Sequence, residues 1–160
     1  MMTSLFEEKQ RFTQWWLYAS LVPVMVLVGV MLWKEGVAWY EWWPMLVMLS
    51  VTGLLQLVTL RTVITTDSVT IYFFPLLLKP KVFRWTDIVQ VYVRRYNPLG
   101  EYGGWGIKGW GSKHGKAYNV KGDKGLQLEL QDGKKILIGT QRTQELEQVL
   151  QQYFKQNRNN

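Results

Sequence analysis

Two long stretches without a charged side chain constrain this chain more than any other feature of its sequence. Residues 12–33 contain no Asp, Glu, Lys or Arg, and residues 42–60 form a second uncharged run. A helix rises about 1.5 Å per residue, so runs of this length approach or exceed the roughly 30 Å hydrocarbon core of a bilayer. The sequence therefore predicts two transmembrane helices, at about residues 12–33 and 42–60.

The two predicted helices form an antiparallel hairpin, because only a few residues separate them. A secretory signal peptide is the alternative for the first run, but its length and the lack of a small-residue cleavage site disfavour that interpretation. Six of the nine tryptophans lie at the ends of the runs, where an amphipathic ring suits the membrane–water interface. The expected interfacial residues are Trp15, Trp16, Trp33, Trp39, Trp42 and Trp43.

The positions of Lys and Arg predict the orientation of the hairpin. Lys9, Arg11 and Arg61 flank the side that carries both termini, whereas the turn carries only Lys34. The positive-inside rule then places both termini in the cytoplasm of a multi-pass protein in the inner (plasma) membrane. Neither predicted span contains an ionisable side chain of Asp, Glu, Lys, Arg or His, which disfavours a pump or channel.

The remainder of the chain is basic and has little of the chemistry that enzymes use. Residues 61–160 hold sixteen of the nineteen Lys and Arg but eight of the twelve Asp and Glu. The chain has no cysteine and one histidine, His114, so thiol chemistry is excluded and a zinc site is disfavoured. We therefore expect no enzyme and no cofactor; an unrecognised hydrolase would need a deep polar pocket.

After residue 61 the pattern changes to alternation of apolar and polar residues, which is typical of strands. Strands are expected at residues 62–65, 69–73, 81–84, 88–96, 126–130 and 135–138. Two more are expected in the glycine-rich residues 97–125, near 104–108 and near 117–121, with a long mobile connection between them. Asp132-Gly133 predicts a hairpin turn. A helix begins at about Thr143, the expected N-cap, with Leu146, Val149, Leu150 and Tyr153 on its apolar face.

These patterns together predict an α+β membrane protein. Residues 1–60 form an N-terminal tail and the transmembrane hairpin, and residues 157–160 form a frayed tail. Residues 61–156 form a strongly bent sheet or open barrel of about seven strands with a C-terminal capping helix.

The predicted β domain resembles the bacterial pleckstrin-homology-like domains that are attached to transmembrane hairpins. The resemblance covers roughly residues 61–155. It depends on Arg84-Trp85-Thr86-Asp87-Ile88 and on Ile138-Gly139-Thr140-Gln141 running into Glu145-Leu146. These motifs are structural, so the resemblance implies a pleckstrin-homology-like fold and no specific reaction.

Two groups of residues are candidates for contact with lipid headgroups or a partner. The apolar tip Leu76-Leu77-Leu78, flanked by Lys79, Lys81 and Arg84, either dips into the membrane interface or packs on the protein. Basic residues of the second group form either a mouth for anionic ligands or an ordinary basic surface beside a membrane. The second group consists of Arg94, Arg95, Lys108, Lys113, Lys116, Lys121 and Lys124.

The glycine-rich segment has no assigned role. It lacks the lysine and helix of a phosphate-binding loop, so its glycines are expected to permit tight turns. Within it, Trp105 is expected in the core, whereas Trp110 is either an exposed anchor or a core residue, and His114 is expected to be solvated.

Two functions remain open from the sequence. The first is a membrane-anchored interaction module that binds a protein partner, a second copy of the chain or anionic headgroups at the cytoplasmic face. The second is a structural subunit whose hairpin packs in a larger membrane complex, with Ser50 and Gly53 as a small-residue contact. No nucleic-acid partner is expected.

Overall fold

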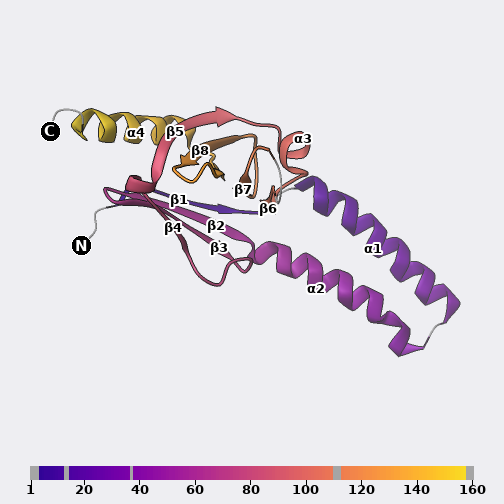
Figure 1. Cartoon of the computed structure of the whole chain (residues 1–160). Coiled ribbons are helices and arrows are strands. Elements are labelled where there is room, and N and C mark those ends of the chain that lie inside the picture. The colour runs from indigo at the N-terminus through magenta and orange to yellow at the C-terminus, as the bar shows by residue number, and fades with distance from the viewer. Residues whose placement is uncertain (1–3, 13–14, 37, 110–112, 158–160) are drawn as a thin grey trace. The chain divides into compact units, whose positions relative to one another are not determined.

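The computed structural model describes residues 4–12, 15–36, 38–109 and 113–157, and it divides the chain into two compact units (Figure 1). One unit, residues 12–57, is a helical hairpin. The other combines residues 1–11 with residues 58–160 and contains two β-sheets, and we call its described part the β domain. The expectation of a mixed α+β chain is thus confirmed.

The helical hairpin consists of α1 (Trp15–Glu35), the 3-10 turn η1 (Trp39–Trp42) and α2 (Trp43–Leu57). Within α1, the segment Tyr18–Glu35 is long and apolar enough to cross a membrane by length and composition, whereas α2 is a shorter apolar helix. The expected second helix reached residue 60. The observed helix α2 ends at Leu57, because Thr59 and Leu60 pair with Phe74 and Phe73 in a sheet. Whether the hairpin spans a membrane stays a prediction.

The first sheet of the β domain has four antiparallel strands in the order β1-β2-β3-β4. Its strands are β1 (Ser4–Arg11), β2 (Thr59–Thr65), β3 (Ser68–Phe74) and β4 (Lys81–Arg84). The expectation of an N-terminal tail was wrong at residues 4–11, which form a full edge strand. Polar Glu8 and Gln10 occupy the buried face of β1 beside Phe6, so the alternation of apolar and polar residues that marks the other strands is missing there.

The helical hairpin is inserted in the sequence between two paired strands. The chain leaves β1 at Arg11 and returns through Val58 to Thr59, which is the β-sheet partner of Arg11. The β domain is therefore discontinuous in sequence, and a fragment that begins at residue 61 lacks β1 and the start of β2.

The second sheet has five strands in the order β5-β8-β9-β7-β6, and all pairs are antiparallel except β7 with β9. Its strands are β5 (Ile88–Arg95), β6 (Gly106–Lys108), β7 (Lys116–Asn119), β8 (Lys124–Leu130) and β9 (Lys135–Gly139). The 3-10 turn η2 (Trp85–Asp87) precedes β5, and the short helix α3 (Pro98–Tyr102) follows it. The described residues thus contain nine strands where about seven were expected, and they form no closed barrel.

The core of the β domain is built from the alternating buried residues of both sheets and from one face of α4 (Thr143–Asn157). Leu146 and Leu150 of α4 are buried as expected, and the ring of Tyr153 stacks on Trp85 with centroids 5.0 Å apart. Thr143 is the first helical residue rather than the cap. The expected frayed tail lies outside the described residues from 158 onward. The pleckstrin-homology-like assignment stays a prediction.

Hydrogen bonds join β1 to the junction of β9 and α4. The carboxylate of Glu8, 4% exposed, accepts from Thr140 Oγ1 at 2.6 Å and from the Gln141 backbone N–H at 2.8 Å. The side-chain amide of Gln10 donates to the Gly139 carbonyl at 2.7 Å. The Gly139-Thr140-Gln141 motif is therefore hydrogen-bonded to β1, which explains why polar residues occupy the buried face of β1.

Candidate anion-binding cleft

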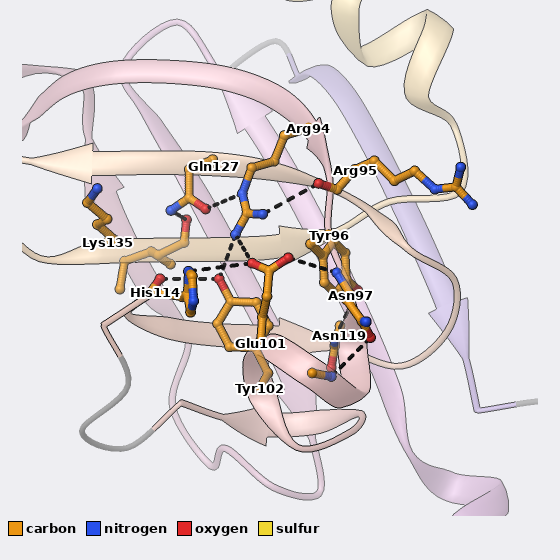
Figure 2. Close-up of polar contacts among 12 residues, drawn as sticks. Arg94, Arg95, Tyr96, Asn97, Glu101, Tyr102, His114, Asn119, Gln127 and Lys135 are labelled. Atoms are coloured by element: carbon orange, nitrogen blue, oxygen red, sulfur yellow. Dashed lines mark hydrogen bonds and ion pairs between the residues drawn. The ribbon is translucent and has the colours of Figure 1, made fainter.

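Arg94, one of the predicted basic residues, is engaged inside the β domain. In Figure 2 its guanidinium points toward Glu101, Tyr102 and Gln127. Arg94 Nη2 lies 2.7 Å from Glu101 Oε2 and donates to the Tyr102 hydroxyl at 3.0 Å, while Nε donates to Gln127 Oε1 at 2.9 Å. This arginine cluster (Arg94, Glu101, Tyr102 and Gln127) joins β5, α3 and β8, so the Arg94 charge is matched internally.

The arginine cluster positions α3 and the start of the glycine-rich segment. The hydrogen bond from Arg94 holds the pKa of Glu101 below its usual value of 4.5, against the opposing effect of burial. The other carboxylate oxygen of Glu101 accepts at 2.8 Å from the backbone N–H of Asn97, the N-cap residue of α3. His114 is exposed with Nδ1 3.6 Å from Glu101 Oε2, and Tyr102 donates to its carbonyl. These contacts are structural, since they fix a loop.

A buried tyrosine borders this cluster. Burial raises the pKa of Tyr96 to about 12, although the hydrogen bond from Asn119 Nδ2 at 2.9 Å works in the opposite direction. The ring of Tyr96 meets that of Tyr102 edge to face, with centroids 5.8 Å apart. Arg95, the neighbouring predicted residue, is 80% exposed at its side chain and pairs with Asp123.

A different set of cations lines a cleft of about 560 Å³ in the β domain, which we call the lysine cleft. Five lysines line it, and they come from β4, from the loop before β7, from β7 itself, and from the β8–β9 turn and the start of β9. They are Lys81, Lys113, Lys116, Lys134 and Lys135. Phe83, Tyr118, Leu130 and Ile136 supply apolar and aromatic walls between these cations.

Two glycines allow the loop before β7 to approach β9 closely enough to form one wall of the cleft. Gly109 and Gly115 have positive φ values of 84° and 80°. A Cβ on Gly115 would lie 2.1 Å from the Lys135 carbonyl oxygen, and one on Gly109 would lie 2.0 Å from the Gly115 carbonyl oxygen. Both glycines are therefore required by space and by backbone conformation.

The lysine cleft has an excess of positive charge. Asp132 is the one acidic residue among those that line it, and it pairs with Lys134 at the exposed turn. Glu129 lies 3.3 Å from Lys135 Nζ, and Lys81 Nζ lies 5.5 Å from the centre of the Tyr118 ring. Exposed ion pairs contribute little and exchange readily, so the cleft can accept a further anion.

The structure assigns the predicted basic residues to different places. Three of them line the lysine cleft, namely Lys81, Lys113 and Lys116. Those that do not line it, besides Arg94 and Arg95, are Lys79, Arg84, Lys108, Lys121 and Lys124. Sequence reasoning missed Lys134 and Lys135, because Asp132-Gly133 indicates only a turn. The parallel pairing of β7 with β9 brings these lysines beside Lys116, and no local pattern in the sequence indicates a parallel pair.

The apolar tip after β3 is open to solvent. Leu78 is 93% exposed, Leu76 is half-exposed and Leu77 is partly buried, with its N–H donating to the Phe73 carbonyl. Lys79 beside them is exposed. Two of the three leucines thus leave the packed core, while Leu77 remains partly covered.

The predicted interfacial tryptophans are largely exposed on the helical hairpin. The side chains of Trp15, Trp33 and Trp43 are exposed, and that of Trp42 is half-buried. Trp110 and the side chains of Trp16 and Trp39 lie outside the part of the chain that the structure describes.

Among the described residues, no three His, Asp or Glu side chains gather as metal ligands would. No known protein-family model matches this chain, and neither the curated proteins nor the solved structures contain a match. By its fold, the chain is therefore classified only as a mixed α+β protein with two sheets and an apolar helical hairpin. The candidate site is identified from its geometry alone.

Proposed function

We propose that this chain is a membrane-anchored, non-enzymatic binding module. The helical hairpin holds the β domain at the cytoplasmic face of the inner membrane, and the lysine cleft binds an anionic group of a protein partner or a lipid headgroup. The observation that carries this proposal is the convergence on one cleft of five lysines from five places in the β domain. Cations placed near an anionic leaflet each contribute about 1 kcal/mol to association.

The apolar tip supports a position close to the bilayer. Exposed leucines next to a lysine, as at Leu76, Leu78 and Lys79, match a surface that enters the interface while its charge meets headgroups. The exposed apolar surface of α1 and α2 supports burial in hydrocarbon, because aliphatic side chains such as Val26, Leu27 and Leu54 would otherwise face water.

The test uses the full-length chain in nanodiscs of phosphatidylcholine, mixed with vesicles that contain phosphatidylglycerol. We expect association that weakens as salt rises, because exposed charges are screened beyond about 10 Å at 0.1 M salt. Replacing Lys81, Lys113 and Lys116 by Gln together should weaken association at least about tenfold.

A matched control removes the same charge elsewhere, by Lys9→Gln, Lys124→Gln and Lys155→Gln, which are exposed outside the cleft. If both triple variants weaken vesicle association equally, the lysine cleft contributes only as ordinary surface charge. If the full-length chain captures neither these vesicles nor any cytosolic protein, the proposed function is wrong.

One observation favours a second function, that of a structural subunit in a larger membrane complex. Ser50 and Gly53 are exposed on α2, and no atom lies within 4 Å of a Cβ built on Gly53, so this small-residue face is not covered by α1. Small residues let helices approach closely in a membrane. Crosslinking from position 53 in native membranes to one neighbour at fixed stoichiometry would favour this function over the binding module.

A further inference from the structure

A second cavity, of about 540 Å³, lies within the helical hairpin itself, near its turn. Residues of α1 at helical spacing form its long wall, so they share one stripe of the helix. These are Val22, Met25, Val26, Gly29, Val30 and Trp33, and Trp42 and Met45 form the opposite wall. We call this cavity the hairpin groove. Its one charged residue is Lys34, at the end nearest the turn.

The length of the hairpin groove corresponds to one leaflet of a bilayer. From Val22 to Trp33 the helix rises about 16 Å, at 1.5 Å per residue. Half of a typical hydrocarbon core is about 15 Å. A chain lying along the groove would therefore extend from the level of Lys34 to the middle of the membrane.

The chemistry of the groove changes along that length in the way a phospholipid does. Aliphatic and thioether side chains line its inner part, and Trp33 and Trp42 line the end near the turn together with Lys34, the residue of the groove that carries an ammonium group. Indoles favour the headgroup level, and an ammonium is a suitable partner for a phosphate. Lys34 forms no ion pair with the residues that the structure describes.

We infer that the hairpin groove binds one acyl chain of a membrane phospholipid, with its phosphate at the Lys34 ammonium. This inference rests on the proposed membrane insertion of the hairpin. A third helix fits less well, because close helix packing favours small residues four apart, whereas Gly29 has Met25 and Trp33 at those positions. A helix would also need an acidic residue to match Lys34. The lipid belongs to the leaflet at the turn.

The test measures phospholipid retained by the full-length chain after purification in a mild detergent, by native mass spectrometry and by phosphorus assay. We expect about one tightly held phospholipid per chain, in agreement with a groove one acyl chain long. Gly29→Leu adds bulk on the groove side, where an added Cβ would lie 3.6 Å from Met45 Cε. It should lower retention at least about fivefold.

The matched control is Gly53→Leu, which makes the same chemical change on α2 in open space outside the groove, and it should retain the lipid. Lys34→Gln keeps the apolar walls intact and should weaken retention of added phosphatidylglycerol about fivefold, the loss of one cation. This variant leaves the helix contacts unchanged, so it remains informative if Gly29→Leu does not fold.

Three outcomes would overturn the inference. They are full lipid retention in Gly29→Leu, equal retention of phosphatidylglycerol in wild type and Lys34→Gln, and a lower oligomeric state in Gly29→Leu without lipid loss, which would make the groove a helix contact. Failure of the proposed function is separate. It appears as a loss of vesicle association while one phospholipid is still retained.

Discussion

Two groups of cations in the same domain have opposite surroundings. In the arginine cluster, the Arg94 side chain is about a quarter exposed and its guanidinium meets a carboxylate, a hydroxyl and an amide oxygen. In the lysine cleft, five lysines and one acidic residue, Asp132, are among the residues that line a space of about 560 Å³. The comparison indicates that an arginine held by several internal acceptors stabilises a loop, whereas a cleft whose lining holds more lysines than carboxylates suits an anionic ligand.

The largest effect on stability is expected at the wall of the lysine cleft. Gly115→Ala places a Cβ against the Lys135 carbonyl at a positive φ, so the loop must move. We expect the free energy of unfolding to fall by about 3 kcal/mol from overpacking and backbone strain. Chemical denaturation of the full-length chain in detergent measures it.

Gly133→Ala is the matched control for this change, because Gly133 has a similar positive φ of 78° but open space at its Cβ position. It should cost only about 1 kcal/mol. Equal costs at the two glycines would show that close approach to β9 contributes nothing.

The next largest effect tests whether the arginine cluster is structural. Arg94→Leu leaves Glu101, Tyr102 and Gln127 without their donor in a partly buried place. We expect the free energy of unfolding to fall by about 2 kcal/mol. This is less than the cost of breaking a fully buried ion pair, because water reaches the cluster. Arg95→Leu removes a largely exposed cation and should change stability by less than about 0.5 kcal/mol. A stable Arg94→Leu protein with weaker vesicle association would reverse the assignment.

Acid should weaken the arginine cluster through Glu101. Its pKa is below 4.5 in the folded chain, chiefly because of the hydrogen bond from Arg94. The stabilisation is therefore fully present above the unfolded pKa of about 4.5 and is lost as pH falls through the lower folded value. Denaturation of wild type and Glu101→Gln at about pH 7 and pH 3 measures it. The stability difference between them should shrink in acid, and a constant difference would contradict the assigned cause.

The smallest effect on stability is expected when lysines of the lysine cleft are replaced. The combined Lys81→Gln, Lys113→Gln and Lys116→Gln variant should change the free energy of unfolding by less than about 1 kcal/mol, because surface substitutions away from buried networks have small effects. The same denaturation experiment applies. A large destabilisation would place these lysines in the structural class with Arg94.

Elements with local signals could be predicted from the amino-acid sequence. Continuous apolar runs fixed the helical hairpin, alternation fixed the strands after residue 61, Asp132-Gly133 fixed a turn, and helical spacing placed Leu146 and Leu150 in the core. These features follow from neighbours along the chain, for which periodicity is a direct physical consequence of burial on one face. The predicted excess of basic residues after residue 61 was equally local.

Which residues share a surface depends on contacts between segments that are far apart in the sequence. Only pairing with β2 and the bonds to Thr140 and Gln141 make residues 4–11 a strand, because they supply partners for a buried Glu8. Likewise, Arg94 and Lys113 belong to the same predicted group of basic residues. Only the fold places Arg94 beside Glu101 and Lys113 at the lysine cleft. Partners far apart in sequence set the cost of burying a charge, so no local pattern indicates it.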